Sequence, residues 1–164
     1  MANILVVDDE PDVLEALARA LRLAGHNVAK AGSADEAIAL SKDHAFDAVV
    51  LDYIMPAMSG IALLNAIRGV QPTIRSVIVS GKIDSEVSED AIVSELRESV
   101  EADSYLHKPL DNARLIETIR QLLEESEGRD WKEVAERNLK AKKRAVDVRN
   151  AERKLNQRRA PKQK

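Results

Sequence analysis

The chain has 164 residues, of which 45% are hydrophobic, and this is enough for one domain of ordinary size with a sizeable core and an appendage. It contains no cysteine, which excludes disulfides and thiolate metal sites, and no apolar run approaches the length that crosses a bilayer. Because residues 1–3 lead directly into an apolar run without an export signal, we expect a cytoplasmic protein that does not insert into membranes.

The net charge of −3 conceals a division into an acidic body and a basic tail. Residues 129–164 contain 14 Lys/Arg and 5 Asp/Glu, which leaves 11 Lys/Arg and 23 Asp/Glu for residues 1–128. Charge asymmetry of this kind is typical of two parts with different partners. Together with the pattern of strands and helices described next, it leads us to expect one domain over residues 1–126 and a basic helical extension over residues 127–164.

The body alternates short apolar runs with segments of helical periodicity. This βαβα pattern predicts an α/β domain with a doubly wound, five-stranded parallel sheet that is covered by helices on both faces. The predicted strands lie at residues 4–7, 28–31, 48–51, 76–79 and 104–106. The predicted helices follow them, at about 11–24, 34–42, 61–67, 85–100 and 112–123.

Several residues mark where these helices begin. Pro11 suits a first helical position, and Ser33 with Glu36 forms a capping-box pattern in which each side chain satisfies a free backbone amide. Asp111 is a candidate cap for the fifth helix.

The basic tail contains neither Gly nor Pro between residues 129 and 159. We therefore predict one long C-terminal helix. Apolar and small side chains recur there by threes and fours, from Trp131 through Val148 to Leu155, as a heptad seam of modest quality. This pattern favours a coiled coil, and hence a homodimer through the C-terminal helix.

Charged residues follow three of the apolar runs. Asp8 and Asp9 follow the first, Asp52 follows the third, and Lys108 follows the fifth. In parallel sheets the ligands bind outside the carboxyl ends of the strands, so we expect three carboxylates and one ammonium group to share a pocket there.

Carboxylates that lie close together resist ionisation unless a cation offsets their charge. A hard divalent ion such as Mg²⁺ (or Mn²⁺) suits oxygen ligands and leaves room for a phosphate, with Asp9 and Asp52 as direct ligands and Asp8 behind them. One carboxylate can then attack a phosphoryl group, while Lys108 and the Ser80 hydroxyl stabilise the transferring oxygens.

The set of motifs resembles the receiver domain of bacterial two-component response regulators. The resemblance covers about residues 1–126 and is carried by five pieces in order, which are Asp8-Asp9, Asp52 through Pro56, Gly60, Ser80-Gly81 and Tyr105 through Pro109. Taken singly, each piece has an ordinary explanation as a turn, a helix start or a strand exit. Their joint order at strand ends favours the functional interpretation.

The resemblance implies a flavodoxin-like sheet of order 2-1-3-4-5 and a role for each matching residue. Asp52 is implied as the phosphoacceptor, Lys108 as the phosphate-binding lysine, and Ser80 and Tyr105 as the switch residues, with a cis bond between Lys108 and Pro109. The implied metal ligands are Asp8, Asp9, Asp52 and the backbone carbonyl of Ile54.

The implied function is a phosphorylation-dependent signalling switch and not an enzyme with turnover. Its implied partners are a sensor histidine kinase or a phosphotransfer protein, and a downstream protein target. We expect slow self-dephosphorylation, because the apolar Ile54 side chain offers no hydrogen bond to an attacking water molecule.

One departure from the family concerns the segment between Ser80 and Lys108, which looks several residues longer than usual. That part of the family's surface usually carries the signal. We expect the fourth helix and the loop before it to be remodelled, and the output to run through protein–protein contacts of the fourth-helix face and the basic C-terminal helix.

Two other functions use related features. A haloacid-dehalogenase-type phosphatase also has a strand-end Asp nucleophile and Mg²⁺, but it normally carries a second Asp two residues later, where this chain has Ile54. A flavin carrier of the same fold is a still weaker candidate, because the acidic pocket would repel a cofactor phosphate.

The basic tail leaves alternatives open. It can pair with itself, dock on the acidic body or bind nucleic acid. We rank self-pairing or protein docking first, because the tail lacks interleaved aromatic residues and a helix-turn-helix pattern.

Overall fold

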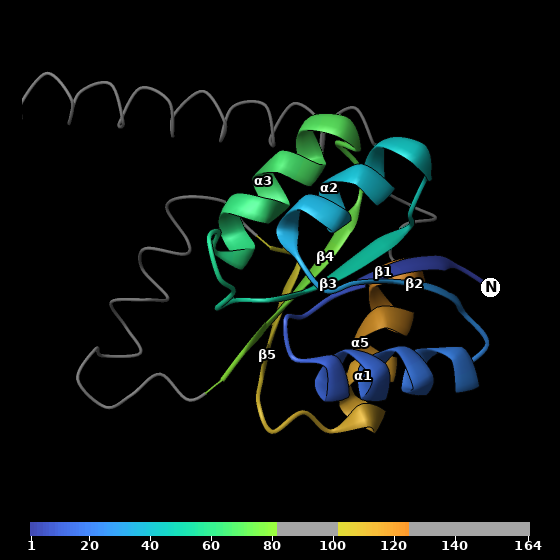
Figure 1. Cartoon of the computed structure of the whole chain (residues 1–164). Coiled ribbons are helices and arrows are strands. Elements are labelled where there is room, and N and C mark those ends of the chain that lie inside the picture. The colour runs from blue at the N-terminus through green and yellow to red at the C-terminus, as the bar shows by residue number, and fades with distance from the viewer. Residues whose placement is uncertain (82–101, 125–164) are drawn as a thin grey trace, which may run out of the picture.

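A computed structural model describes residues 1–81 and 102–124 of the chain. These residues form one parallel sheet with the strand order β2-β1-β3-β4-β5 (Figure 1). The strands are β1 (Asn3–Val7), β2 (Asn27–Ala31), β3 (Ala48–Asp52), β4 (Arg75–Ser80) and β5 (Ser104–His107). The helices are α1 (Pro11–Leu23), α2 (Ala34–Asp43), α3 (Gly60–Val70) and α5 (Asn112–Glu124).

The predicted fold class is confirmed. All five strands and the four helices named above appear within three residues of the predicted bounds. The predicted fourth helix at 85–100 and the C-terminal helix lie outside the described residues, as does the proposed boundary at residue 126.

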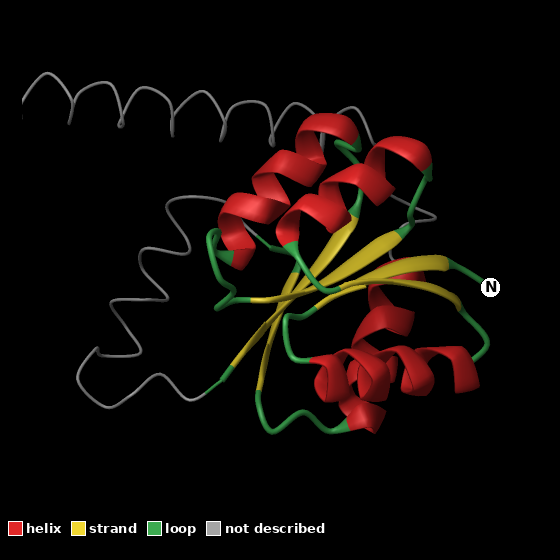
Figure 2. Cartoon of the chain, viewed as in Figure 1, coloured by secondary structure: helices red, strands yellow, loops and turns green. Residues whose placement is uncertain are grey.

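The sheet separates two apolar clusters. Helices α1 and α5 cover one face and α2 and α3 cover the other (Figure 2). Alternate side chains of β1 point into different clusters, Ile4 and Val6 toward α1 and α5, and Leu5 and Val7 toward α2 and α3. All four are at most 1% exposed, so the strand is buried on both faces, which explains its uninterrupted apolar sequence.

The helix starts follow the predicted chemistry with one correction. Pro11 is the first residue of α1, and the Asp111 carboxylate accepts the Ala113 N–H at 2.9 Å. Ser33 Oγ accepts the Glu36 N–H at 3.3 Å, as predicted. The Glu36 carboxylate, however, reaches the N–H of Gly32 at 2.8 Å instead of that of Ser33, one residue further back along the chain.

The strand register brings the candidate site residues to one edge of the sheet. Val7 pairs with Leu51, Asp52 pairs with Val79, and Ser80 pairs with His107. The residues that follow these pairs therefore leave the sheet at the same edge. Among the described helices, none is long and apolar enough to cross a bilayer.

Candidate functional site at the carboxyl edge of the sheet

Three carboxylates converge at this edge. Oxygen atoms of Asp8, Asp9 and Asp52 all lie within 4.8 Å of one another. Asp8 and Asp52 are buried, with exposed fractions of 1% and 6%, whereas Asp9 is exposed. The cluster is thus open to solvent on the side of Asp9 and enclosed by protein behind the other two residues.

Asp8 is held by contacts on both of its carboxylate oxygens. Its Oδ1 accepts the Glu10 N–H at 2.9 Å, and its Oδ2 accepts a hydrogen bond from Lys108 Nζ at 3.0 Å. The first contact closes a turn just before α1, where a carboxylate is favoured by the positive end of the helix dipole. Asp8 therefore joins the start of α1 to the end of β5.

Lys108 lies among the carboxylates. Its Nζ is 3.0 Å from Asp8 Oδ2, 3.2 Å from Asp52 Oδ1 and 3.7 Å from Glu10 Oε1. Burial lowers the pKa of Lys108, but hydrogen bonds and charges, first from Asp8 and then from Asp52, outweigh burial and raise the pKa above its ordinary value. The ammonium group therefore stays protonated at neutral pH.

The environment of Asp52 disfavours its charge. Burial is the largest cause that raises the pKa of Asp52, and the charges of Asp8 and Asp9 raise it further. Lys108 acts in the opposite direction without cancelling the rise. An additional cation near these oxygens would lower the energy of the ionised cluster.

The composition and geometry of the cluster fit a hard divalent cation. Carboxylate oxygens are the preferred ligands of Mg²⁺, which usually takes one or two carboxylates from a protein and keeps several waters. Two buried carboxylates and one exposed one, close enough to share an ion, meet this requirement.

Gly60, which has no side chain, lets the start of α3 lie close against the end of β3. Its N–H donates to Tyr53 O at 2.9 Å. A Cβ atom on Gly60 would overlap the carbonyl oxygen of Asp52, so no larger residue fits there without movement of the backbone. Gly60 thus places Asp52 close beneath the first turn of α3.

Ser80 lies at the end of β4, where its Oγ donates to the Gly81 carbonyl at 3.1 Å. Ile54 lies just past Asp52 in the loop before α3, and the residue is 63% exposed. The Lys108–Pro109 bond is cis, as the resemblance implied.

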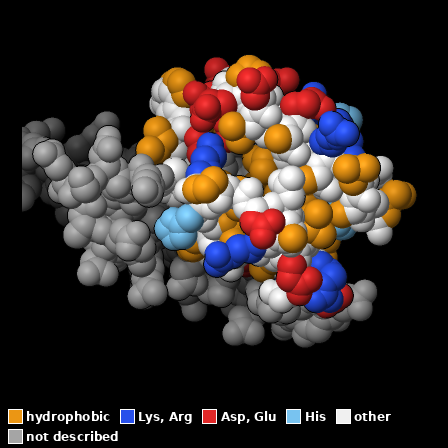
Figure 3. All heavy atoms as spheres, turned by 90° about the horizontal axis from the view of Figure 1, so that it is seen from below, with side chains coloured by type: hydrophobic (Ala, Val, Ile, Leu, Met, Phe, Trp, Pro, Cys, Tyr) orange, Lys and Arg blue, Asp and Glu red, His pale blue; other side chains and the backbone are white. Residues whose placement is uncertain are grey.

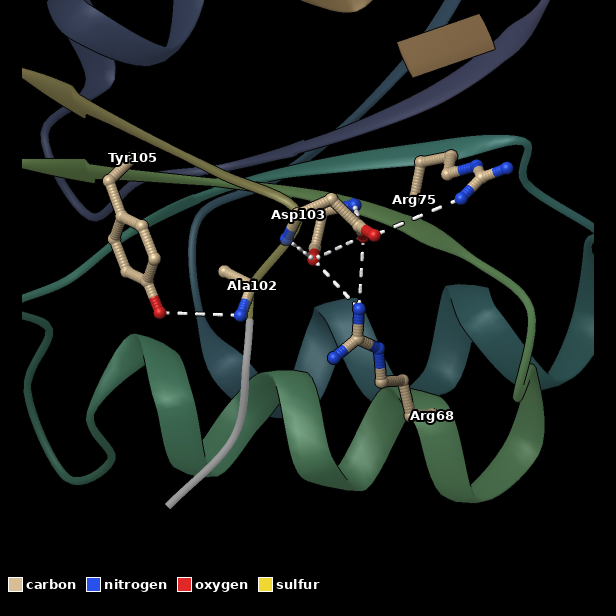
Figure 4. Close-up of polar contacts among 6 residues, drawn as sticks. Arg68, Arg75, Ala102, Asp103 and Tyr105 are labelled. Carbon is tan, nitrogen blue, oxygen red and sulfur yellow. Dashed lines mark hydrogen bonds and ion pairs between the residues drawn. The ribbon is translucent and has the colours of Figure 1, made fainter. Parts of the chain in front are cut away.

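Tyr105 is 38% exposed, and its hydroxyl accepts the Ala102 N–H at 3.2 Å (Figure 4). The ring is therefore directed toward the segment that precedes β5.

A pocket of about 320 Å³ adjoins Lys108, between α1 and the segment after β5. Its apolar lining includes Val13, Ala16, Leu17, Pro109 and Leu110. On the side of the molecule where α1 and α5 lie, hydrophobic side chains are dispersed among acidic and basic ones (Figure 3).

Sequence reasoning missed two residues, one at the site and one at the opposite edge of the sheet. One is Glu10, the third carboxylate within ion-pair distance of Lys108. Its position directly after Asp8 and Asp9 was a signal that could have included it. The other is Asp103, a buried residue before β5 whose partners come from α3 and β4, and no short motif indicates those partners.

The chain belongs to the response regulator receiver domain family, whose model matches residues 4–120. The fold, the strand order and the strand-end motifs agree with this membership.

Among similar proteins, the transcriptional regulatory protein PrrA of Mycobacterium tuberculosis is 37% identical over 121 residues. That alignment covers 74% of this chain and 49% of PrrA, so the chain spans about half the length of this relative.

Two solved structures show the same fold. The CheY-like receiver domain protein from Methanospirillum hungatei is 29% identical with a TM-score of 0.67, over 77% of this chain and 97% of that one. The receiver domain of NtrX from Brucella abortus is 34% identical with a TM-score of 0.62, over 74% and 98% of the two chains.

Proposed function

We propose that this chain is a phosphorylation-dependent signalling switch that accepts a phosphoryl group on Asp52 from a histidine kinase or a phosphotransfer protein. The observation that carries the proposal is the meeting of three carboxylates and one lysine at the carboxyl edge of the sheet. Membership of the receiver family supports it. A cytoplasmic location is part of the same proposal.

The transfer step uses Asp52 as the nucleophile. A carboxylate oxygen of Asp52 forms a bond to phosphorus, the bond between phosphorus and the donor breaks, and the donor leaves with the electron pair. Lys108 Nζ is already beside Asp52 Oδ1 at 3.2 Å and would neutralise charge on the transferring oxygens. This role requires no large movement of the lysine.

Asp8, Asp9, Asp52 and the backbone carbonyl of Ile54 would hold Mg²⁺ or Mn²⁺. Bound there, the ion supplies positive charge that offsets the carboxylates and the phosphoryl oxygens. The burial of Asp8 and Asp52 gives these residues fixed positions, whereas the exposure of Asp9 leaves a side open for water and for the donor.

Ser80 and Tyr105 would report the modification. The Ser80 hydroxyl donates only to the adjacent carbonyl among the contacts of the described residues, so turning toward a phosphoryl group costs it one weak hydrogen bond. Tyr105 would then leave its contact with Ala102 and turn inward. The fourth-helix segment and the basic tail, which we propose as the output surfaces, lie outside the described residues.

A phosphodonor protein must approach Asp52 across the surface that surrounds the site. The apolar pocket beside Lys108 lies on that surface and is bordered by α1 and the segment after β5. It provides contact area for a kinase or phosphotransfer helix next to the reacting carboxylate.

The experiment that tests this function separates a switch from an enzyme. The protein is incubated with acetyl phosphate and Mg²⁺, and bound phosphoryl groups and released phosphate are both quantified. A switch takes up at most one phosphoryl group per chain, and a chelator abolishes uptake. A parallel assay offers the protein a generic phosphate ester. Continuous hydrolysis of that ester would instead support an aspartate-nucleophile phosphatase.

A further inference from the structure

A buried polar network joins the amino ends of β4 and β5 (Figure 4). Asp52 lies at the opposite edge of the sheet, where β3 ends. At its centre is Asp103, whose side chain is 5% exposed. The Oδ2 atom of Asp103 accepts hydrogen bonds from Ser76 N and Ser76 Oγ, each at 2.9 Å, and from Arg68 Nη2 at 3.0 Å. Arg75 Nη1 lies 3.8 Å from Asp103 Oδ1.

The contacts between Ser76 and Asp103 are reciprocal. Besides the two bonds that Ser76 donates, its Oγ accepts the Asp103 N–H at 3.1 Å. Ser76 and Asp103 directly precede Val77 and Ser104, the first residue pair of the β4–β5 ladder. The network therefore fixes the point at which β5 begins to pair with β4.

Strand β5 needs such a fixed point. It has only four residues. It is an outer strand of the described sheet, so it pairs with β4 alone. A slip of one residue moves a strand by about 3.3 Å and turns each side chain to the opposite face. Burial restrains the slip weakly, because Leu106 is the only buried residue of the four.

The register of β5 decides where Lys108 lies. At the far end of the ladder Ser80 pairs with His107, and the next N–H, that of Lys108, donates to Ser80 O at 2.7 Å. The ion pairs of Lys108 Nζ with Asp8 and Asp52 span 3.0 and 3.2 Å, so a slip of about 3.3 Å would break them both.

We propose that Asp103 is a positioning residue for phosphoryl transfer. By clamping the start of β5 to Ser76 and Arg68, it sets the strand register and thereby holds Lys108 beside Asp8 and Asp52 at the other edge of the sheet. The inference rests on the proposed function for its catalytic consequence. Its structural part, the control of register by Asp103, stands on the contacts of the network.

The contacts of Asp103 also position the hydrogen bond between Tyr105 and Ala102. The Ala102 N–H that binds the Tyr105 hydroxyl belongs to the residue adjacent to Asp103. Fixing Asp103 therefore fixes both partners of this hydrogen bond, one on each side of the clamp.

Amide hydrogen exchange tests the structural part in the full chain. In Asp103→Asn, we expect the Lys108 N–H to exchange about tenfold faster, because opening of the β4–β5 ladder becomes easier when its starting contacts weaken. Ser76→Ala, which retains the Ser76 N–H, is a milder variant for which we expect the same change at smaller size. Unchanged exchange of Lys108 in both variants would overturn the proposal.

A destabilised variant elsewhere provides the control. Ile38→Ala removes apolar contacts in α2, which packs on α3, β1 and β2. It should accelerate exchange broadly without a selective effect on Lys108. A selective rise at Lys108 in this control would contradict a specific role for Asp103.

Phosphorylation kinetics test the catalytic part. At saturating Mg²⁺, Asp103→Asn should lower the rate of phosphorylation by acetyl phosphate about tenfold, since small misplacements of catalytic groups cost this much or more. The Mg²⁺ concentration for half-maximal rate should not rise, because displacement of Lys108 removes a positive charge that competes with the ion for Asp8 and Asp52. A rise in that concentration would indicate a generally loosened site and contradict the proposal.

A double-mutant cycle separates positioning from general damage. If Asp103 acts through Lys108, Asp103→Asn should change the rate less than about twofold in a Lys108→Met background. Equal effects in both backgrounds would overturn the inference. If the wild-type protein takes up no phosphoryl group, the proposed function fails. The amide-exchange experiment still tests whether Asp103 controls the register of β5.

Discussion

At the scale of single residues, Asp52 lies in an environment that favours its neutral form. Burial and the neighbouring charges of Asp8 and Asp9 raise its pKa, although Lys108 is 3.2 Å away. An acid whose pKa is raised by folding stabilises the folded state when protonated, and this contribution is lost as the pH rises through the folded-state pKa. Without added metal, the ionised Asp52 is therefore a cost to stability at neutral pH.

We accordingly expect Asp52→Asn to be more stable than the wild-type protein at neutral pH without divalent cations. Lys108 keeps its partner Asp8, and one of the clustered charges is removed. The gain in the free energy of unfolding should be about 1 kcal/mol, as measured by urea denaturation. It should shrink as the pH falls through the raised pKa of Asp52, because the wild-type carboxyl then becomes neutral. A constant gain at all pH values would contradict this explanation.

The exposed side chain of Ile54 leads to a prediction on phosphoryl lifetime. It lies two residues past Asp52 and provides no polar atom that could orient an attacking water molecule. We expect Ile54→Gln to shorten the lifetime of the phosphorylated protein several-fold, because its amide can hydrogen-bond water. Decay of the phosphorylated mass measures the lifetime. A wild-type lifetime of seconds would reject slow self-dephosphorylation.

At the scale of elements, the close approach of α3 to β3 makes Gly60 sensitive to substitution. Gly60→Ala should destabilise the protein by about 2 kcal/mol or more, because the new methyl group overlaps Asp52 O and the backbone must shift. Thermal unfolding measures this loss. Gly32→Ala is the matched control, because a Cβ there meets only Glu36 Oε2, at 3.8 Å. Equal losses for the two variants would show that helix packing at Gly60 is not the cause.

The elements of this fold are well predicted from sequence because their signals are local. The strand before Asp8 is an uninterrupted apolar run, and helix starts are marked by Pro11, Ser33 and Asp111. The carboxylate cluster was predictable for the same reason, since each member follows a strand directly and parallel strands end at one edge.

Other features could not be predicted because they depend on contacts between distant segments. Asp103 looks like an ordinary polar residue before a strand, yet it is buried with Arg68 from α3 and Ser76 from β4. The orientation of Tyr105 is likewise set by a backbone N–H whose position depends on this packing. Neither the hydrophobic periodicity of the sequence nor the spacing of its motifs indicates such partners.

At the scale of the whole molecule, an acidic body precedes a basic tail that lies outside the described residues. If the tail pairs with itself, light scattering on the full chain should give twice the monomer mass, whereas a version that ends at Ser126 should be monomeric. Because coiled coils depend mainly on apolar contacts, the dimer should persist in moderate salt. Equal, monomeric masses for the two versions would reject self-pairing.

The central claim is that Asp52 accepts a phosphoryl group with the help of a metal ion and Lys108. The most direct test is the intact mass of the full chain after treatment with acetyl phosphate and Mg²⁺, compared between the wild-type protein and Asp52→Asn. We predict a gain of one phosphoryl group in the wild-type protein and none in Asp52→Asn. No gain in the wild-type protein, or an equal gain in the variant, would contradict the claim.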